Sequence, residues 1–85
     1  MEEQANKYAG IYSVYGLQQM IEEEETNINY KKKEREDVGK SWTPEMIECH
    51  RHAMNEEISM IEERLEVLKE ALQIRQKQQE IEYNI

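Results

Sequence analysis

The chain has little of several residue types, and each shortage excludes a class of protein. It contains one cysteine, one proline, three glycines and no phenylalanine. The single cysteine, Cys49, excludes a disulfide within one chain, and no zinc-type Cys/His spacing is present. No apolar run approaches a membrane span, and the N-terminal residues Glu2 and Glu3 are unlike a secretory signal. We expect a soluble cytoplasmic protein with no membrane partner, no metal and no cofactor.

Positive charge is also scarce. The chain has eleven basic and nineteen acidic side chains, which give a formal net charge of −8. Such a surface repels phosphate backbones, so we expect no direct binding of nucleic acid. No nucleophile–base pair with an orienting group can be assembled, and there is no glycine-rich phosphate loop. We therefore expect no enzymatic activity and assign no catalytic residue.

The most regular feature of the sequence is the stretch from Thr43 onward. Thr43 suits the N-cap of a helix and Pro44 its first position. Apolar residues then alternate at steps of three and four, which is the a/d pattern of a heptad repeat. The pattern predicts a helix over residues 43–80. Its apolar seam, which we expect to mediate self-association, consists of Met54, Ile58, Ile61, Leu65, Leu68 and Leu72.

A second apolar column runs beside this seam, at the c positions of the same heptads. Its members are Met46, Ala53, Met60, Val67, Ile74 and Ile81. Together the two columns make an apolar face twice as broad as a two-stranded coiled coil needs, which indicates two helical neighbours. Because a small two-helix chain has little core, we expect a second copy to supply the missing contact, with Met60, Val67 and Ile74 on the flank.

The first half of the chain predicts another helix, over residues 8–36. Tyr8, Ile11, Tyr12 and Tyr15 have helical spacing, and the stripe Val14, Leu17, Ile21 and Ile28 continues it, interrupted by Glu24. The polar residues 1–7 are expected to fray. Gly10 and Gly16 are the weak points of this helix.

Residues 37–42 form the predicted connection, with Gly39 in a left-handed helix-ending position. A connection this short favours antiparallel neighbours. We predict an all-α fold: a single helical-hairpin domain over residues 1–85, completed as a bundle by self-association. In the simplest register Lys31 to Arg35 lie opposite Glu45 and Glu48. The same register brings Glu22 to Glu25 near Glu56 and Glu57, which is unfavourable.

Candidate partner-binding residues are the aromatic and apolar side chains Tyr8, Ile11, Tyr12, Tyr15 and Trp42. Tyrosine and tryptophan are enriched at protein interfaces. The tyrosines can equally pack on the second helix, and Trp42 can form a hydrophobic staple at the start of that helix. Cys49, His52 and Glu56 share one exposed side of that helix. One helix column cannot surround a metal ion, so we assign no metal site.

These features favour a small acidic module that self-associates and binds another, unidentified protein. Acidic helical proteins without motifs are common in phage and mobile-element genomes, where they often inhibit a host protein, and we expect a function of this type. One alternative is a decoy that mimics nucleic acid through Glu22 to Glu25, Glu56, Glu57, Glu62, Glu63, Glu66 and Glu70. Another is a nucleotide-binding sponge that uses the tyrosines with Lys31 to Arg35.

Overall fold

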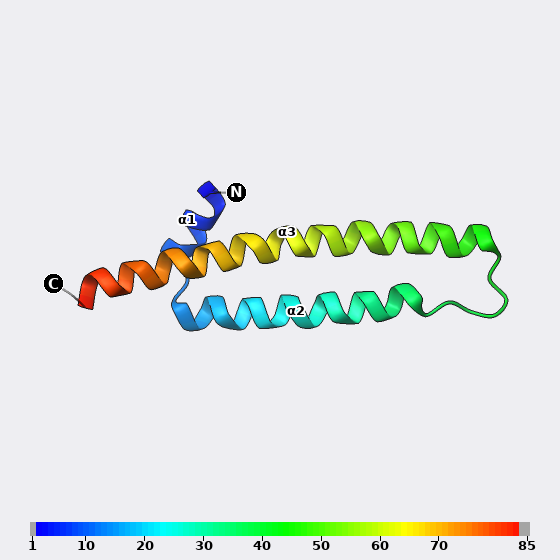
Figure 1. Cartoon of the computed structure of the whole chain (residues 1–85), viewed down its shortest axis with the longest axis horizontal. Coiled ribbons are helices and arrows are strands. Elements are labelled where there is room, and N and C mark those ends of the chain that lie inside the picture. The colour runs from blue at the N-terminus through cyan, green and yellow to red at the C-terminus, as the bar shows by residue number, and fades with distance from the viewer. Residues whose placement is uncertain (1, 84–85) are drawn as a thin grey trace.

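The computed structural model describes residues 2–83, which form three α-helices: α1 (Glu2–Ile11), α2 (Val14–Glu36) and α3 (Pro44–Tyr83). Within this range there is no strand, so the predicted all-α class is confirmed. α2 and α3 lie side by side and run in opposite directions, while the short α1 crosses α3 (Figure 1). The molecule is a rod measuring 64 × 20 × 15 Å.

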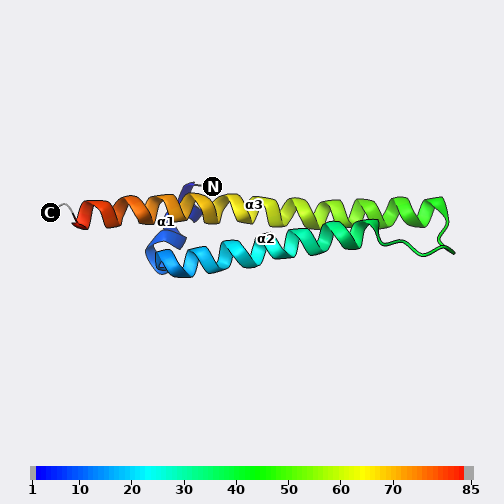
Figure 2. The ribbon, with the colours of Figure 1, turned by 60° about the horizontal axis from the view of Figure 1, so that its bottom comes forward.

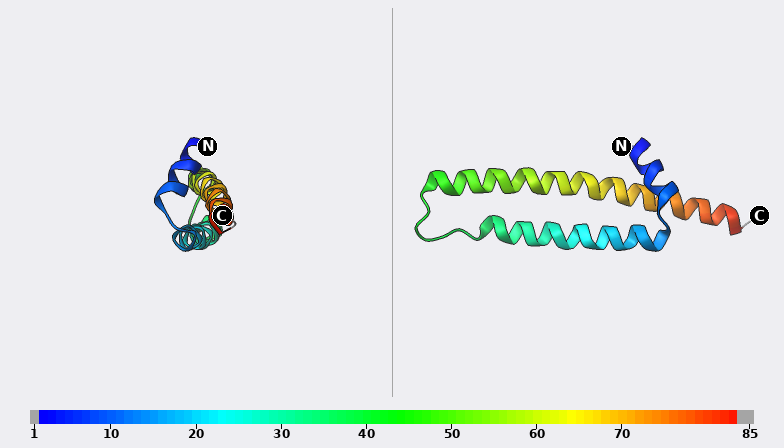
Figure 3. Two further views of the ribbon diagram at one scale, coloured as in Figure 1. Left: turned by 90° about the vertical axis from the view of Figure 1, so that its left-hand side faces the viewer. Right: turned by 180° about the vertical axis from the view of Figure 1, so that it is seen from behind.

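The single helix predicted over residues 8–36 is wrong, because the chain breaks at Tyr12 and Ser13. The Ser13 hydroxyl accepts a hydrogen bond from the Gly16 amide at 3.1 Å and caps the start of α2. The segment from Glu2 to Lys7, expected to fray, is helical. α1 turns away from the axis of α2 and lies on a different side of α3, as the end-on and rear views show (Figure 3).

Small side chains allow α1 to pack closely on α3. Ala5 and Ala9 are one helical turn apart on α1, and both are fully buried. They belong to one core cluster with Val67 and Ala71 of α3, both also buried. The cluster is completed by Leu17 and Leu68, and the partly buried side chains around it are Tyr8, Met20, Ile21, Leu72 and Ile74.

α2 lies along α3 (Figure 2), and the buried residues between the two helices belong to the a/d seam. Ile28 of α2 is buried, as are Ile58, Ile61 and Leu68 of α3. The remaining seam residues Met54, Leu65 and Leu72 are half-buried. Much of the seam is therefore covered within one chain, whereas the sequence analysis assigned it to contacts between copies.

The start of α3 follows its sequence signals. The Thr43 hydroxyl accepts a hydrogen bond from the Met46 amide at 3.2 Å, and Pro44 is the first helical residue. The prediction for Gly39 is wrong, because no glycine in the described chain has a positive φ. Gly39 instead makes room for an indole ring: a Cβ added there would lie 2.7 Å from Nε1 of Trp42.

The register between α2 and α3 also differs from the simplest one. The connection first runs outward along the rod before α3 turns back, so the first turns of α3 extend past the end of α2 (Figure 1). Lys31 consequently meets Glu57 at 2.9 Å and does not face Glu45 or Glu48. This shift removes the predicted clash of acidic groups, since Glu24 now lies 3.3 Å from Arg64 and Glu25 lies 3.7 Å from Lys69.

Candidate interaction surfaces

The elbow between α1 and α2 carries the four residues Tyr8, Ile11, Tyr12 and Tyr15, here named the elbow cluster. Their spacing predicts a single helix, but Tyr8 and Ile11 lie on α1, Tyr12 lies in the break and Tyr15 lies on α2. The rings of Tyr8 and Tyr12 stack at 5.9 Å, and Tyr8 is half-buried against the core cluster. Ile11 is 62% exposed and Tyr15 is 71% exposed. The elbow cluster thus has an inner, packed part and an outer, exposed part.

Trp42 has a different environment, at the far end of the rod. Its ring is half-buried, lies over Gly39 and meets the ring of His50 edge to face at 5.0 Å. The Nε2 atom of His50 lies 2.8 Å from the carbonyl oxygen of Glu34, close to the end of α2. As a donor, this nitrogen gives the Glu34 carbonyl a second hydrogen bond, because the Asp37 amide already donates to it at 3.2 Å. The structure therefore places Trp42 in a packed tip and separates it from the elbow cluster by the length of α2.

The flank residues of α3 divide into two groups. Val67 is buried and Ile74 half-buried where α1 covers them, which makes α1 of the same chain a second neighbour of α3. Towards the start of α3 the same column is uncovered: Met60 is 63% exposed and Met46 is 49% exposed. Ala53, between them, is also exposed. We name Met46, Ala53 and Met60 the outer strip.

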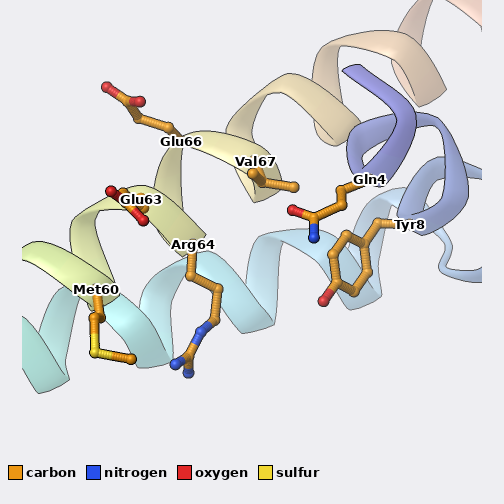
Figure 4. A pocket seen from close by; sticks show the side chains of 7 residues that line it. All are labelled: Gln4, Tyr8, Met60, Glu63, Arg64, Glu66 and Val67. Atoms are coloured by element: carbon orange, nitrogen blue, oxygen red, sulfur yellow. The ribbon is translucent and has the colours of Figure 1, made fainter. Parts of the chain in front are cut away.

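A notch of about 450 Å³ lies where the outer strip meets α1 (Figure 4). Gln4 and Tyr8 of α1 line one side, and Met60, Arg64 and Val67 of α3 line the other. Glu63 and Glu66 complete its rim. The notch is thus partly apolar, and it is closed at one end by α1.

Ion pairs join α2 to α3 on both flanks of the seam. Glu24 interrupts the apolar stripe of α2 and is only 16% exposed, and its carboxylate is paired with the guanidinium of Arg64. On α2 the ammonium of Lys31 is hydrogen-bonded to Glu57, which raises the pKa of Lys31, although loss of hydration opposes the effect. The more exposed pairs, such as Glu25 with Lys69, contribute about 0–1 kcal/mol each and define the register more than they stabilise the fold, whereas the covered Glu24 depends more strongly on its partner.

The polar column of Cys49, His52 and Glu56 lies on the exposed side of α3. His52 and Glu56 are 3.2 Å apart and both are largely exposed, and Cys49 is a free, exposed thiol. Between residues 2 and 83 there is no group of three metal-ligating side chains close enough to hold an ion. Over the same range, no helix combines the length and the apolar character needed to cross a membrane.

Two features of these surfaces are not predicted by the sequence pattern. Ala5 and Ala9 lie in a polar segment, and only their spacing of four residues, in line with Tyr8, signals a contact face. The pairing of Glu24 with Arg64 depends on a register that the connection sets. Comparison with known proteins adds no further information, since no protein-family model, curated protein or solved structure matches the chain.

Proposed function

We propose that the protein is a non-enzymatic interaction module that pairs with a second copy and binds another protein through the elbow cluster, thereby modulating that protein. The observation that carries this proposal is the exposure of Ile11 and Tyr15 beside a docked α1. Two large side chains held on an ordered elbow offer contact area at low entropic cost, as interface residues do.

The arrangement of the elbow supports separate roles for its tyrosines. Tyr8 packs against the core cluster and stacks on Tyr12, which holds the break between α1 and α2 in place. Tyr15, in the first turn of α2, has its ring in solvent and lies across the break from the exposed Ile11. Packing and recognition therefore use different members of the elbow cluster.

Affinity capture with mass spectrometry tests the proposal, using the double variant Ile11→Ala/Tyr15→Ala. Loss of about 2 kcal/mol at an interface centre weakens binding about 30-fold, so the partner should disappear from the captured fraction. Tyr30→Ala is the matched control, because Tyr30 is 63% exposed on the same α2 but lies away from the elbow. If both variants capture the same proteins as the wild type, the elbow cluster is not the binding surface.

The two alternative functions have weaker support. An acidic decoy needs free carboxylates, whereas Glu24, Glu25 and Glu57 are paired with basic side chains of the same chain. A nucleotide sponge needs free cations, whereas Lys31 and Arg35 are bonded to acidic groups. Capture that persists at about 0.5 M salt supports apolar recognition, and capture lost at that salt concentration supports the decoy.

A further inference from the structure

The outer strip is the exposed continuation of a face that is already an interface within the chain. Where α1 lies on this face, Val67 and Ala71 are buried. Where α1 ends, Met60 and Met46 are exposed, although they belong to the same apolar column. The start of α3 therefore lacks the second neighbour that its middle has around Val67 and Ala71.

We propose that this neighbour is α3 of a second copy, packed antiparallel across a two-fold axis at Ala53. The inference deepens the proposed function, because it assigns the pairing of two copies to the outer strip and leaves the elbow cluster free for the other protein. It also narrows the expectation from sequence, in which the a/d seam as well as the flank residues Met60, Val67 and Ile74 joined the copies.

The spacing of the outer strip is self-complementary. Met46 and Met60 are each seven residues from Ala53, so the strip has a large, a small and a large side chain at equal intervals. A two-fold axis at Ala53 places Met46 of one copy against Met60 of the other, at both ends of the contact. Isologous interfaces require this kind of symmetry, and the two alanines at the axis allow the helices to approach closely.

The columns that flank the strip are compatible with this pairing. In an antiparallel pair each flank meets the same flank of the other helix, displaced along the axis. On one flank this places His50 near Glu57 of the second copy, although both also contact α2 of their own chain, and on the other it places Cys49 near Glu56. Neither flank brings like charges directly together at the centre of the contact, despite the acidic character of the chain.

α1 would limit the contact at each end. Pro44, the first residue of α3, falls opposite Glu62 of the other copy, just before the segment that α1 covers. The first turn of α3, with Met46, would then enter the notch between α1 and α3 beside Met60 (Figure 4). A shift of one heptad towards α1 would bring the helix end against α1, so α1 limits the register in that direction.

The surface area of the chain leaves room for such an interface. Its accessible surface is 6672 Å². A compact monomer of 10.3 kDa exposes about 5,400 Å². A standard interface buries roughly 800 Å² per partner, which is less than this excess. The rod shape explains why one chain exposes so much surface, and pairing through α3 reduces it.

Disulfide trapping tests the axis. In a Cys49→Ser background, Ala53→Cys should form a cross-linked dimer on mild oxidation, because the two Cα atoms come within the roughly 4.4–6.8 Å that a disulfide needs. His52→Cys, one residue away but about 100° around the helix, is the matched control and should remain uncrosslinked. Equal cross-linking of both variants, or none at position 53, would overturn the proposal.

A mixing experiment tests the register. Met46→Cys and Met60→Cys chains, both with Cys49→Ser, should cross-link to each other after mixing, whereas neither should cross-link to itself. Two copies of the same residue would lie about 21 Å apart along the helix, since each is seven residues from the axis. Self-linked products as abundant as the mixed product would contradict the antiparallel arrangement.

Light scattering separates this inference from the proposed function. At about 50 µM the wild type should have twice the mass of one chain, and Ala53→Glu should weaken the dimer at least tenfold without affecting partner capture. A wild-type monomer that still captures its partner through Tyr15 refutes the outer-strip dimer alone. A dimer that Ala53→Glu dissociates, but whose captured proteins do not depend on Ile11 or Tyr15, supports the dimer and refutes the elbow.

Discussion

Replacing Leu68 by alanine should remove much of the stability of this fold. Leu68 is 1% exposed, in the core cluster where α1, α2 and α3 meet. A leucine at such a site loses its burial energy and leaves a cavity when it is truncated, which costs about 2–5 kcal/mol. A chain of this length is stabilised by roughly 4–13 kcal/mol in total, so this one change takes a large part of it.

Urea unfolding followed by circular dichroism measures the effect, at one fixed protein concentration because pairing of copies adds to stability. With a slope of about 1–1.5 kcal/mol/M, a loss of 3 kcal/mol lowers the midpoint by about 2–3 M. Tyr30→Ala is the control, since Tyr30 is exposed and should change the free energy of unfolding by less than about 0.5 kcal/mol. A cost below about 1 kcal/mol for Leu68→Ala, no larger than the control, would refute the three-helix junction.

Three further predictions concern the contacts between α2, α3 and the connection. Arg64→Ala should lower the free energy of unfolding in urea by about 1–3 kcal/mol, because the mostly covered Glu24 loses its partner. The double variant Arg64→Ala/Glu24→Leu should recover most of this stability, and no recovery would mean that the pair does not interact. Gly39→Ala should change the emission of the sole tryptophan, because its Cβ would come 2.7 Å from Trp42 Nε1; an unchanged spectrum would mean that the indole lies elsewhere. The hydrogen bond to Glu57 raises the pKa of Lys31. The stability that this pair contributes is therefore present at neutral pH and is lost as pH rises above about 10.5. Glu57→Gln should reduce that alkaline loss, measured as the melting temperature against pH.

Local signals predicted much of α3. Its cap at Thr43, its first residue Pro44 and the buried Ile58, Ile61 and Leu68 all follow from sequence spacing. The broad apolar face also indicated a second neighbour. That this neighbour is α1 of the same chain was not predictable from periodicity. Two alanines in a polar segment give only a weak pattern until the helix on which they pack is known.

The break at Ser13 shows why the first helix was predicted incorrectly. Tyr8, Ile11, Tyr12 and Tyr15 keep helical spacing across the break, so periodicity favours one continuous helix. A straight helix would carry Ala5 and Ala9 to the polar end of α3, from about Gln79 to Tyr83. Bending at Ser13 buries them on Val67 and Ala71 instead, and the cap from Ser13 to Gly16 offsets part of the cost of the break.

The register of α2 on α3 was not predictable for a related reason. The number of residues in the connection does not reveal whether it turns tightly or runs outward first. Here Trp42 packs over Gly39 and His50 reaches the carbonyl of Glu34, so the start of α3 extends past α2. The resulting offset decides which charges meet, and with it which acidic residues remain free at the surface.

The bend between α1 and α2 underlies both the elbow cluster and the notch, and a distance between two spin labels tests it most directly. The labels are attached at Gln4→Cys and Glu66→Cys in a Cys49→Ser background, with unlabelled protein added to suppress signals between copies. Both positions line the same notch, so the account predicts one short distance. In a continuous helix over α1 and α2, Gln4 would lie opposite the end of α3, roughly 27 Å along the rod from Glu66. A dominant long distance would contradict the account.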